Sequence, residues 1–169
     1  MVKLFQGSPR ACNSIAIVVA RFNSEITSAL TDGAIHTLKE AGVADDNIYV
    51  YHVPGALEIP LMCEIVAARH DAVIALGCVI QGDTPHFDYV CNEASRGILD
   101  VSLRHCKPVM MGVLTCDTYA QAQHRSSRSA FNTSEDAIVN GEKETPECNK
   151  GCECARAALE MISLIDQSK

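Results

Sequence analysis

The sequence predicts an α/β fold, a flavodoxin-like three-layer sandwich in which helices cover both faces of a four-stranded parallel sheet. Three observations predict it. Short apolar runs rich in Val and Ile are typical of strands buried on both faces. Segments with apolar residues at helical spacing lie between these runs, and the two kinds of segment alternate along the chain. The length suits one domain with a substantial core, so residues 1–169 are expected to form a single unit.

The elements follow in order. The first expected helix covers residues 25–40, with Asn23 or Ser24 as its N-cap and Gly42 at its end. The next two expected helices cover residues 57–68 and 88–105, where Leu, Val, Ala and Ile recur every three or four positions. The last expected helix repeats Cys154, Ala158, Ile162 and Ile165. The expected strands cover residues 14–20, 47–53, 72–80 and 108–115.

Two segments lie outside this alternation. Residues 1–13 are an N-terminal tail. Residues 126–147 are polar and charged, contain Gly141 and Pro146, and are expected to form an exposed insertion before the last helix.

The charge balance excludes some classes of function. Lys and Arg total 14 against 21 Asp and Glu, a formal charge of −7, which disfavours a general binder of nucleic acid or of anionic membranes. No apolar run approaches the roughly 20 residues of a membrane helix, and the N-terminus lacks a secretory pattern. A cytoplasmic protein is therefore expected.

The nine cysteines favour reduced, buried thiols over disulfides, because several lie in apolar runs, such as Cys63, Cys78 and Cys91. The stretch CNKGCEC, with Cys148, Cys152 and Cys154, could be interpreted as a metal-binding site. On a helix starting near Lys150, however, Cys152 and Cys154 lie about 200° apart, so they do not readily share an ion, and no metal is expected.

Ligands of open parallel sheets bind beyond the carboxyl ends of the strands. Phe22 follows the first strand there, where its ring could stack on a flat heterocycle or form a hydrophobic staple onto the next helix. Pro54 and Gly55 predict a sharp turn that brings backbone amides near a ligand. Glu58 could serve the site or only the helix dipole.

The stretch GDTPH, residues 82–86, follows the third expected strand. Its Gly82, Asp83 and Thr84 precede a helix whose free N–H groups favour an anion such as phosphate. His86 stands beside these amides and could exchange protons near neutral pH. Of the other histidines, His70 and His124 are expected at the polar surface.

Arg125 and Lys150 could neutralise a phosphate. Arg125 lies about ten residues past the fourth strand, so a helix would carry it roughly 10–15 Å from its own sheet edge. If it acts beside His86, it belongs to a neighbouring subunit.

Five motifs in this order resemble the lumazine synthase family: RFN, VPGALEIP, LGCVIQGDTPHFDYVCNEASRGI, GVLT with QAQHR, and NKG. The resemblance runs from about Ile15 to Ile165, apart from the insertion. It implies the same fold and the condensation of 5-amino-6-(D-ribitylamino)uracil with 3,4-dihydroxy-2-butanone 4-phosphate to 6,7-dimethyl-8-ribityllumazine, phosphate and water, in riboflavin biosynthesis. No cofactor or metal is implied.

The resemblance also implies roles for individual residues. Phe22 would stack on the pyrimidine, with Asn23 of the same motif in the substrate site. His86 would shuttle protons, and Arg125 of the adjacent subunit would grip the phosphate. The remaining substrate-binding positions are Ala56, Leu57, Glu58, Val79, Ile80, Asp83, Thr84 and Lys150.

Two departures from the family pattern stand out. Met111 replaces an aromatic that usually reaches the neighbour's site, and a thioether stacks less well. The 126–147 insertion replaces a few residues with a Gly-rich turn. Family members form homopentamers, some of which pack twelvefold into a shell; the insertion would lie near the contacts between pentamers, so a pentamer that does not close into a shell is expected.

Three alternatives fit the sequence less well. An archaeal-type riboflavin synthase shares the VPG turn but lacks the GDTxH arrangement. A non-catalytic flavin- or ribityl-binding homologue would be expected to have lost His86 or Arg125. A flavodoxin-like FMN carrier needs a longer Ser- and Thr-rich loop where ARFNSE stands.

Overall fold

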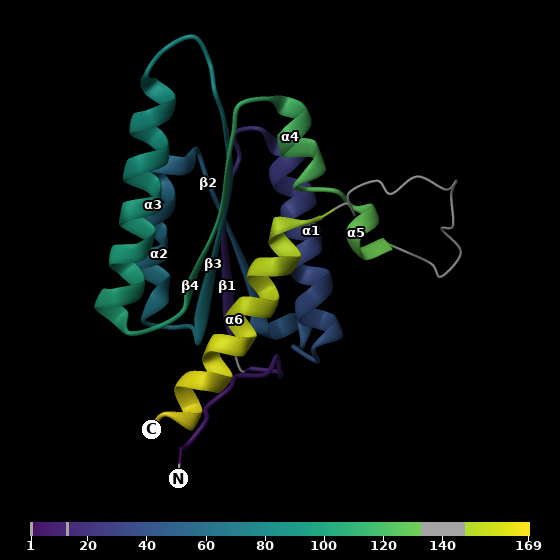
Figure 1. Ribbon diagram of the computed structural model, residues 1–169, viewed down its shortest axis with the longest axis vertical. Coiled ribbons are helices and arrows are strands. Elements are labelled where there is room, and N and C mark those ends of the chain that lie inside the picture. Colours follow the sequence, from purple (N-terminus) through teal and green to yellow (C-terminus); the bar gives the residue numbers. More distant parts are fainter. Residues whose placement is uncertain (1, 13, 133–147) are drawn as a thin grey trace.

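The computed structural model describes residues 2–12, 14–132 and 148–169. The described residues form one parallel sheet of four strands in the order β2-β1-β3-β4 (Figure 1). The strands are β1 (Ile15–Ala20), β2 (Ile48–Val53), β3 (Ala72–Ile80) and β4 (Val109–Cys116). This confirms the predicted fold class, and each strand lies within one residue of its expected bounds.

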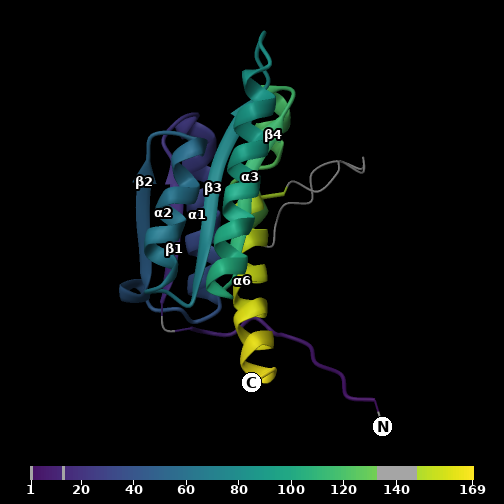
Figure 2. The same ribbon diagram turned by 90° about the vertical axis from the view of Figure 1, so that its left-hand side faces the viewer.

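Helices cover both faces of the sheet. Figure 2 shows α2 (Ile59–Ala67) and α3 (His86–His105) on one face, and α1 (Ser24–Glu40) and α6 (Lys150–Gln167) on the other. In β1, Ile15, Ile17 and Val19 pack in the core beneath α1 and α6, while Ala16 and Val18 pack beneath α2 and α3. The central strand is therefore buried on both sides, which explains its continuous apolar sequence.

Short helical turns supplement the predicted elements. The turn η1 (Asp45–Asn47) precedes β2, and η2 (Ala56–Glu58) precedes α2, which therefore begins later than predicted. Two further short helices, α4 (Tyr119–His124) and α5 (Ser129–Asn132), follow β4. The helix predicted over 88–105 begins two residues earlier, so His86 is its first residue.

The predicted cap of α1 is wrong in its mechanism. Asn23 occupies the N-cap position with left-handed backbone angles (φ 56°, ψ 49°), but its side chain makes no capping bond. Its amide instead donates to the carbonyl oxygen of Cys78 in β3 over 2.9 Å. Gly42, with φ 87°, lies just past the end of α1 as predicted, because this conformation suits a residue without a Cβ.

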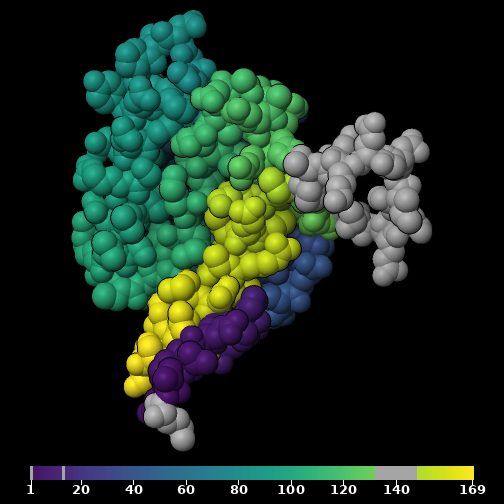
Figure 3. Space-filling view, viewed as in Figure 1, coloured from purple at the N-terminus to yellow at the C-terminus, as the bar shows by residue number. Residues whose placement is uncertain are grey.

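The N-terminal segment runs along α6, as Figure 3 shows. The Ser8 N–H donates to Ser163 Oγ over 3.3 Å, and Arg10 forms a 3.0 Å ion pair with Asp166. A Cβ on Gly7 would lie 2.2 Å from the carbonyl oxygen of Glu160, so the two backbones are in close contact. Residues 6–10 of the tail are thus packed on the last helix, whereas Val2 and Leu4 are exposed.

The start of the polar insertion is also packed. Ser126 is buried and forms an antiparallel bridge with Asn149, and Arg128 pairs with Asp32 of α1 at 2.7 Å. The ring of Phe131 lies 5.2 Å from that of His36. Residues 133–147 lie outside the described residues.

Asn149 joins the start of α6 to α1. Its Nδ2 donates to the carbonyl oxygen of Ala29 over 3.0 Å, and its Oδ1 accepts from the N–H of Gly151 over 2.9 Å. A Cβ on Gly151 would lie 1.9 Å from the carbonyl oxygen of Leu30. The two helices therefore approach at backbone distance.

The amino edge of the sheet holds a buried histidine. His70 is 5% exposed, with Nδ1 2.5 Å from Ser14 Oγ and Nε2 3.3 Å from Tyr51 Oη. The prediction of a surface position for His70 is therefore wrong, whereas His124 is exposed as predicted. Lys107 Nζ donates to the carbonyl oxygens of Ala67 and His70 over 2.9 and 2.8 Å.

The cysteines are free thiols in varied settings. Burial raises the pKa of Cys63 to about 12, while Cys91 is half-buried. Cys106 is exposed at the left-handed C-cap of α3. Within the parts of the chain that the structure describes, none of the helices combines the length and the hydropathy needed to cross a membrane.

Candidate active site

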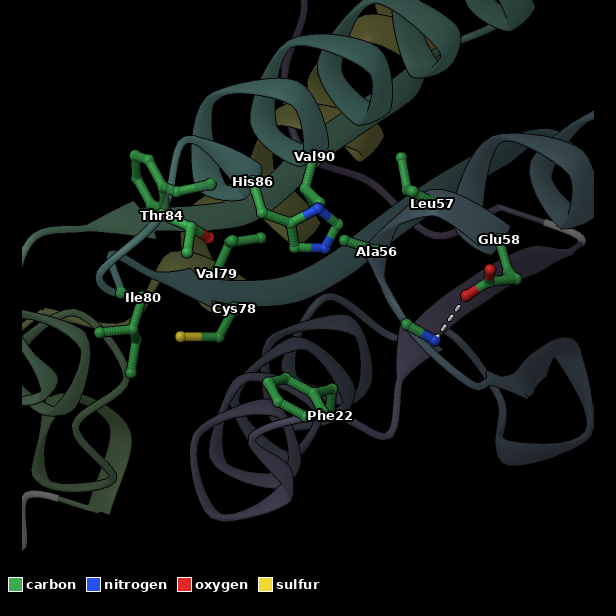
Figure 4. A pocket seen from close by; sticks show the side chains of 13 residues that line it. Phe22, Ala56, Leu57, Glu58, Cys78, Val79, Ile80, Thr84, His86 and Val90 are labelled. Atoms are coloured by element: carbon green, nitrogen blue, oxygen red, sulfur yellow. Dashed lines mark hydrogen bonds between the residues drawn. The ribbon is translucent and has the colours of Figure 1, made fainter.

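A cavity of about 380 Å³ lies at the carboxyl ends of β1, β2 and β3 (Figure 4). Four parts of the chain form its walls: the β1–α1 turn, the β2–η2 turn, the end of β3 and the first turns of α3. It is lined by Phe22, Gly55, Ala56, Leu57, Glu58, Cys78, Val79, Ile80, Gly82, Thr84, His86, Phe87 and Val90.

The cavity brings together eight of the residues predicted for the substrate site: Phe22, Ala56, Leu57, Glu58, Val79, Ile80, Thr84 and His86. Three lining residues were not predicted: Cys78, Phe87 and Val90. Periodicity could have found two of them, since Cys78 lies two positions before Ile80 on a strand, and Val90 lies four positions after His86 on a helix. It does not mark Phe87.

Phe22 lies at the rim. Its side chain is 71% exposed, so it is not buried against α1 as a staple would be. The main chain around it is held, because the Phe22 N–H donates to the carbonyl oxygen of Pro54 over 3.3 Å. The ring offers a free aromatic face to a flat ligand.

Glu58 closes the β2–η2 turn. Its Oε2 accepts the N–H of Gly55 over 2.8 Å, drawn as a dashed line in Figure 4. The carboxylate thus supports the first turn and also lines the cavity. Ala56 lies between them and is buried.

His86 begins α3, with Pro85 at the N-cap position. Figure 4 shows its imidazole directed into the cavity, close to Ala56 and Val79. Thr84 lies beside it on the loop that leads out of β3. The residue is exposed, so a proton can pass between the ring, a ligand and solvent.

The other five predicted site residues do not line the cavity of their own chain. Asn23 directs its amide to Cys78 and Asp83 lies exposed on the loop before α3. Met111 lies in β4, paired with Ala75 of β3 and 40% exposed. The remaining two are Arg125 and Lys150.

Arg125 and Lys150 lie together at the ends of two helices. Arg125 is the C-cap of α4 and Lys150 is the first residue of α6, and the Lys150 N–H donates to the Arg125 carbonyl oxygen over 2.9 Å. Lys150 Nζ pairs with Glu153 at 2.8 Å, and this hydrogen bond raises the pKa of Lys150.

The Cys78 thiol lines the cavity. Burial raises the pKa of Cys78 to about 12, with a smaller contribution from Cys116. Cys152 donates to the Gly33 carbonyl oxygen, whereas Cys154 Sγ would lie 3.0 Å from a Cβ on Gly112, so the two thiols have different neighbours. No cluster of three His, Cys, Asp or Glu among the described residues is arranged to hold a metal ion.

The fold and the cavity are typical of α/β enzymes, whose small-molecule sites lie at the carboxyl edge of a parallel sheet. The model of the 6,7-dimethyl-8-ribityllumazine synthase family matches residues 13–166 of the chain. The chain belongs to this family.

The predicted activity is thereby confirmed. The reaction is a transferase condensation of 5-amino-6-(D-ribitylamino)uracil with 3,4-dihydroxy-2-butanone 4-phosphate in riboflavin biosynthesis. Its substrates are small molecules.

Proposed function

We propose that the condensation takes place in the cavity at the carboxyl edge of the sheet. One observation carries this proposal: an exposed aromatic ring, a carboxylate and a histidine, from three separate connections, line the same cavity of about 380 Å³. This volume is in the range of small-molecule sites, roughly 300–1,000 Å³.

The pyrimidine substrate binds on the Phe22 side. The ring of Phe22 stacks on the heterocycle, and the apolar side chains of Val79 and Ile80 cover its other edges. Glu58 accepts hydrogen bonds from the ribityl hydroxyls, beside the main chain of Ala56 and Leu57. The Gly55 N–H supports this role because it holds the carboxylate in one orientation.

The phosphate of the second substrate binds at the N-terminus of α3. The first N–H groups of a helix lack carbonyl partners within the helix, and its dipole favours an anion there. The first N–H groups of α3, which begins at His86, supply these donors, together with the amides of the preceding loop around Asp83 and Thr84. The site is open, so a neighbouring cation can reach the same phosphate.

His86 moves protons during imine formation, phosphate elimination and ring closure. General acid–base transfer by one side chain contributes typically about 10²–10⁴-fold. Holding two reactants face to face contributes more, up to about 7–11 kcal/mol. Proximity therefore supplies more of the rate enhancement in this site than proton transfer does.

A neighbouring subunit completes the site. Arg125 and Lys150 do not line the cavity of their own chain, yet a main-chain hydrogen bond holds these two basic residues together. We propose that this pair, with Met111, faces the cavity of the adjacent protomer. Exposed apolar side chains support an oligomer, namely Leu61 and Ile65 of α2 and Leu99 and Leu103 of α3.

The assembly is a homopentamer that does not close into a shell. The packing of Arg128 and Phe131 on α1 supports a specific position for residues 126–132 at the outside of the protomer. Light scattering tests the size of the particle. A mass near a megadalton would contradict this part of the proposal.

The experiment for the function mixes the purified protein with both substrates and follows the absorbance of the lumazine product. We expect the lumazine product to form only when both substrates are present. The rate of its formation should fall in a Phe22→Ala, His86→Ala double variant. An unchanged rate in that variant would place the chemistry elsewhere in the chain. The matched control is His36→Ala, on the outer part of α1.

A further inference from the structure

The β1–α1 turn is bonded to the strands on both sides of β1. Toward β2, the Arg21 N–H donates to the carbonyl oxygen of Val53 over 2.8 Å, and the Phe22 N–H donates to that of Pro54 over 3.3 Å. Toward β3, Asn23 Nδ2 donates to the carbonyl oxygen of Cys78 over 2.9 Å. A side chain, not the main chain, makes the bond on the β3 side.

This bond lies beyond the end of strand pairing. The last pair between β1 and β3 is Val19 with Leu76, and Cys78 lies two residues further along β3. The side-chain amide of Asn23 therefore donates to the Cys78 carbonyl oxygen at a position where β1 is no longer paired with β3. It continues the connection between the two strand ends at Cys78, which lines the cavity.

The backbone of Asn23 serves a second purpose. Its carbonyl oxygen accepts the N–H groups of Ile26 and Thr27 over 3.0 and 3.1 Å, and so begins α1. Its left-handed angles turn the chain from the strand into the helix, and asparagine tolerates this conformation better than most residues. Asn23 is thus fixed by its backbone and by its amide together.

Phe22 is the residue that this arrangement orients. A side chain that is 71% exposed has little packing to hold it, so its direction depends on the main chain on either side. Resting on the stacking role of Phe22 proposed above, we propose that Asn23 is a positioning residue: its amide, anchored on Cys78, sets the direction in which the Phe22 ring reaches over the cavity.

The test is steady-state kinetics of Asn23→Gly with the butanone phosphate saturating. Glycine keeps the left-handed conformation and removes the side chain that carries the amide. We expect the KM for the ribitylaminopyrimidine to rise about threefold to tenfold, the loss of one hydrogen bond, with kcat changed less than about twofold. The matched control is Asn47→Gly at the other edge of the sheet, which should leave both constants unchanged.

A double-mutant cycle separates positioning from a merely structural role. In a Phe22→Ala background the Asn23→Gly change should raise the KM less than about twofold, because the ring that it positions is absent. The same fold-change in both backgrounds would overturn the proposal and leave the stacking role of Phe22 intact. A Phe22→Ala enzyme with the wild-type KM would overturn both.

Asn23→Asp is the second variant. It is nearly isosteric and tolerates the left-handed conformation, but it sets a carboxylate oxygen against the Cys78 carbonyl. The same rise in KM is expected, with a thermal midpoint within a few degrees of the wild type. A wild-type KM for this folded variant would contradict the role of the amide.

Discussion

The main-chain N–H of Lys150 donates a 2.9 Å hydrogen bond to the carbonyl oxygen of Arg125. It joins the first residue of α6 to the C-cap of α4, on either side of residues 133–147, which the structure does not describe. Arg125 and Lys150, which are distant in sequence, therefore lie next to each other where α4 ends and α6 begins. Because neither lines the cavity of its own chain, their contribution to catalysis can be tested separately from that of His86.

Arg125→Ala should weaken use of the phosphate substrate. A charge-assisted hydrogen bond to phosphate contributes about 1.5–3 kcal/mol, so the KM for the butanone phosphate should rise about tenfold to hundredfold while that for the pyrimidine changes little. Steady-state kinetics checks both constants. Arg156→Ala, an exposed position on α6, is the control. A rise confined to the pyrimidine KM would refute the assignment.

Mixing two variants tests whether subunits share a site. When His86→Ala and Arg125→Ala chains are unfolded and reassembled together, about a quarter of the sites should combine an intact His86 with an intact neighbouring Arg125. Activity should rise above that of either variant reassembled alone. No gain on mixing, with hetero-assembly shown by mass spectrometry, would mean that both residues act within one chain.

His86→Ala should retain measurable activity. Loss of proton transfer lowers kcat by about 10²–10⁴-fold, but the two substrates are still held together. Single-turnover and steady-state rates, compared with the reaction in buffer, measure what remains. A variant that binds both substrates yet reacts no faster than buffer would show that His86 supplies most of the catalysis.

Gly151→Ala should destabilise the protein, although alanine is the better helix former by about 1 kcal/mol. The added Cβ would lie 1.9 Å from the Leu30 carbonyl oxygen, a backbone atom that cannot rotate away. A net loss of about 1–3 kcal/mol in the free energy of unfolding is expected from urea titration. Gly82→Ala is the control, since no described atom lies within 4 Å of its Cβ. Equal stabilities for the two variants would contradict the close approach of α6 and α1.

His70 should make stability depend on pH. Burial lowers the pKa of His70, and Arg69 and Lys107 lower it further, against a smaller opposing effect of Asp71. The unfolded chain binds the proton from about pH 6.5 downward, whereas the folded chain resists it, so the free energy of unfolding falls as the pH drops below 6.5. The slope attributable to this group is at most about 1.4 kcal/mol per pH unit. His70→Gln, compared by urea titration at pH 7.5 and 5.5, should lose part of this dependence; an identical slope would remove His70 as its source.

The sequence predicted what local patterns encode. Continuous apolar runs gave strands close to their observed bounds, and the residues that follow them, such as Phe22, Glu58 and His86, converge because parallel strands end at one edge. A helix carrying Arg125 was expected after the fourth strand, but without bounds, and α5 was not predicted, since six and four residues hold too few repeats for periodicity.

Long-range contacts account for the errors. The sequence places His70 next to Arg69 and Asp71 and so suggests a surface histidine, but Ser14, just before β1, and Tyr51 of β2 bond its two ring nitrogens. The capping prediction for Asn23 failed for the same reason, because the hydrogen bond from its Nδ2 to the Cys78 carbonyl oxygen fixes the side chain in an orientation in which its oxygen makes no capping bond. A local pattern holds no information on such partners.

Cys106 offers a practical consequence. It is the exposed cysteine at the end of α3, while the other eight are half-buried or buried, so a maleimide dye should attach there first. This position lies at the amino edge of the sheet, across the molecule from the cavity. A fluorophore could therefore report on subunit exchange in real time without touching the chemistry.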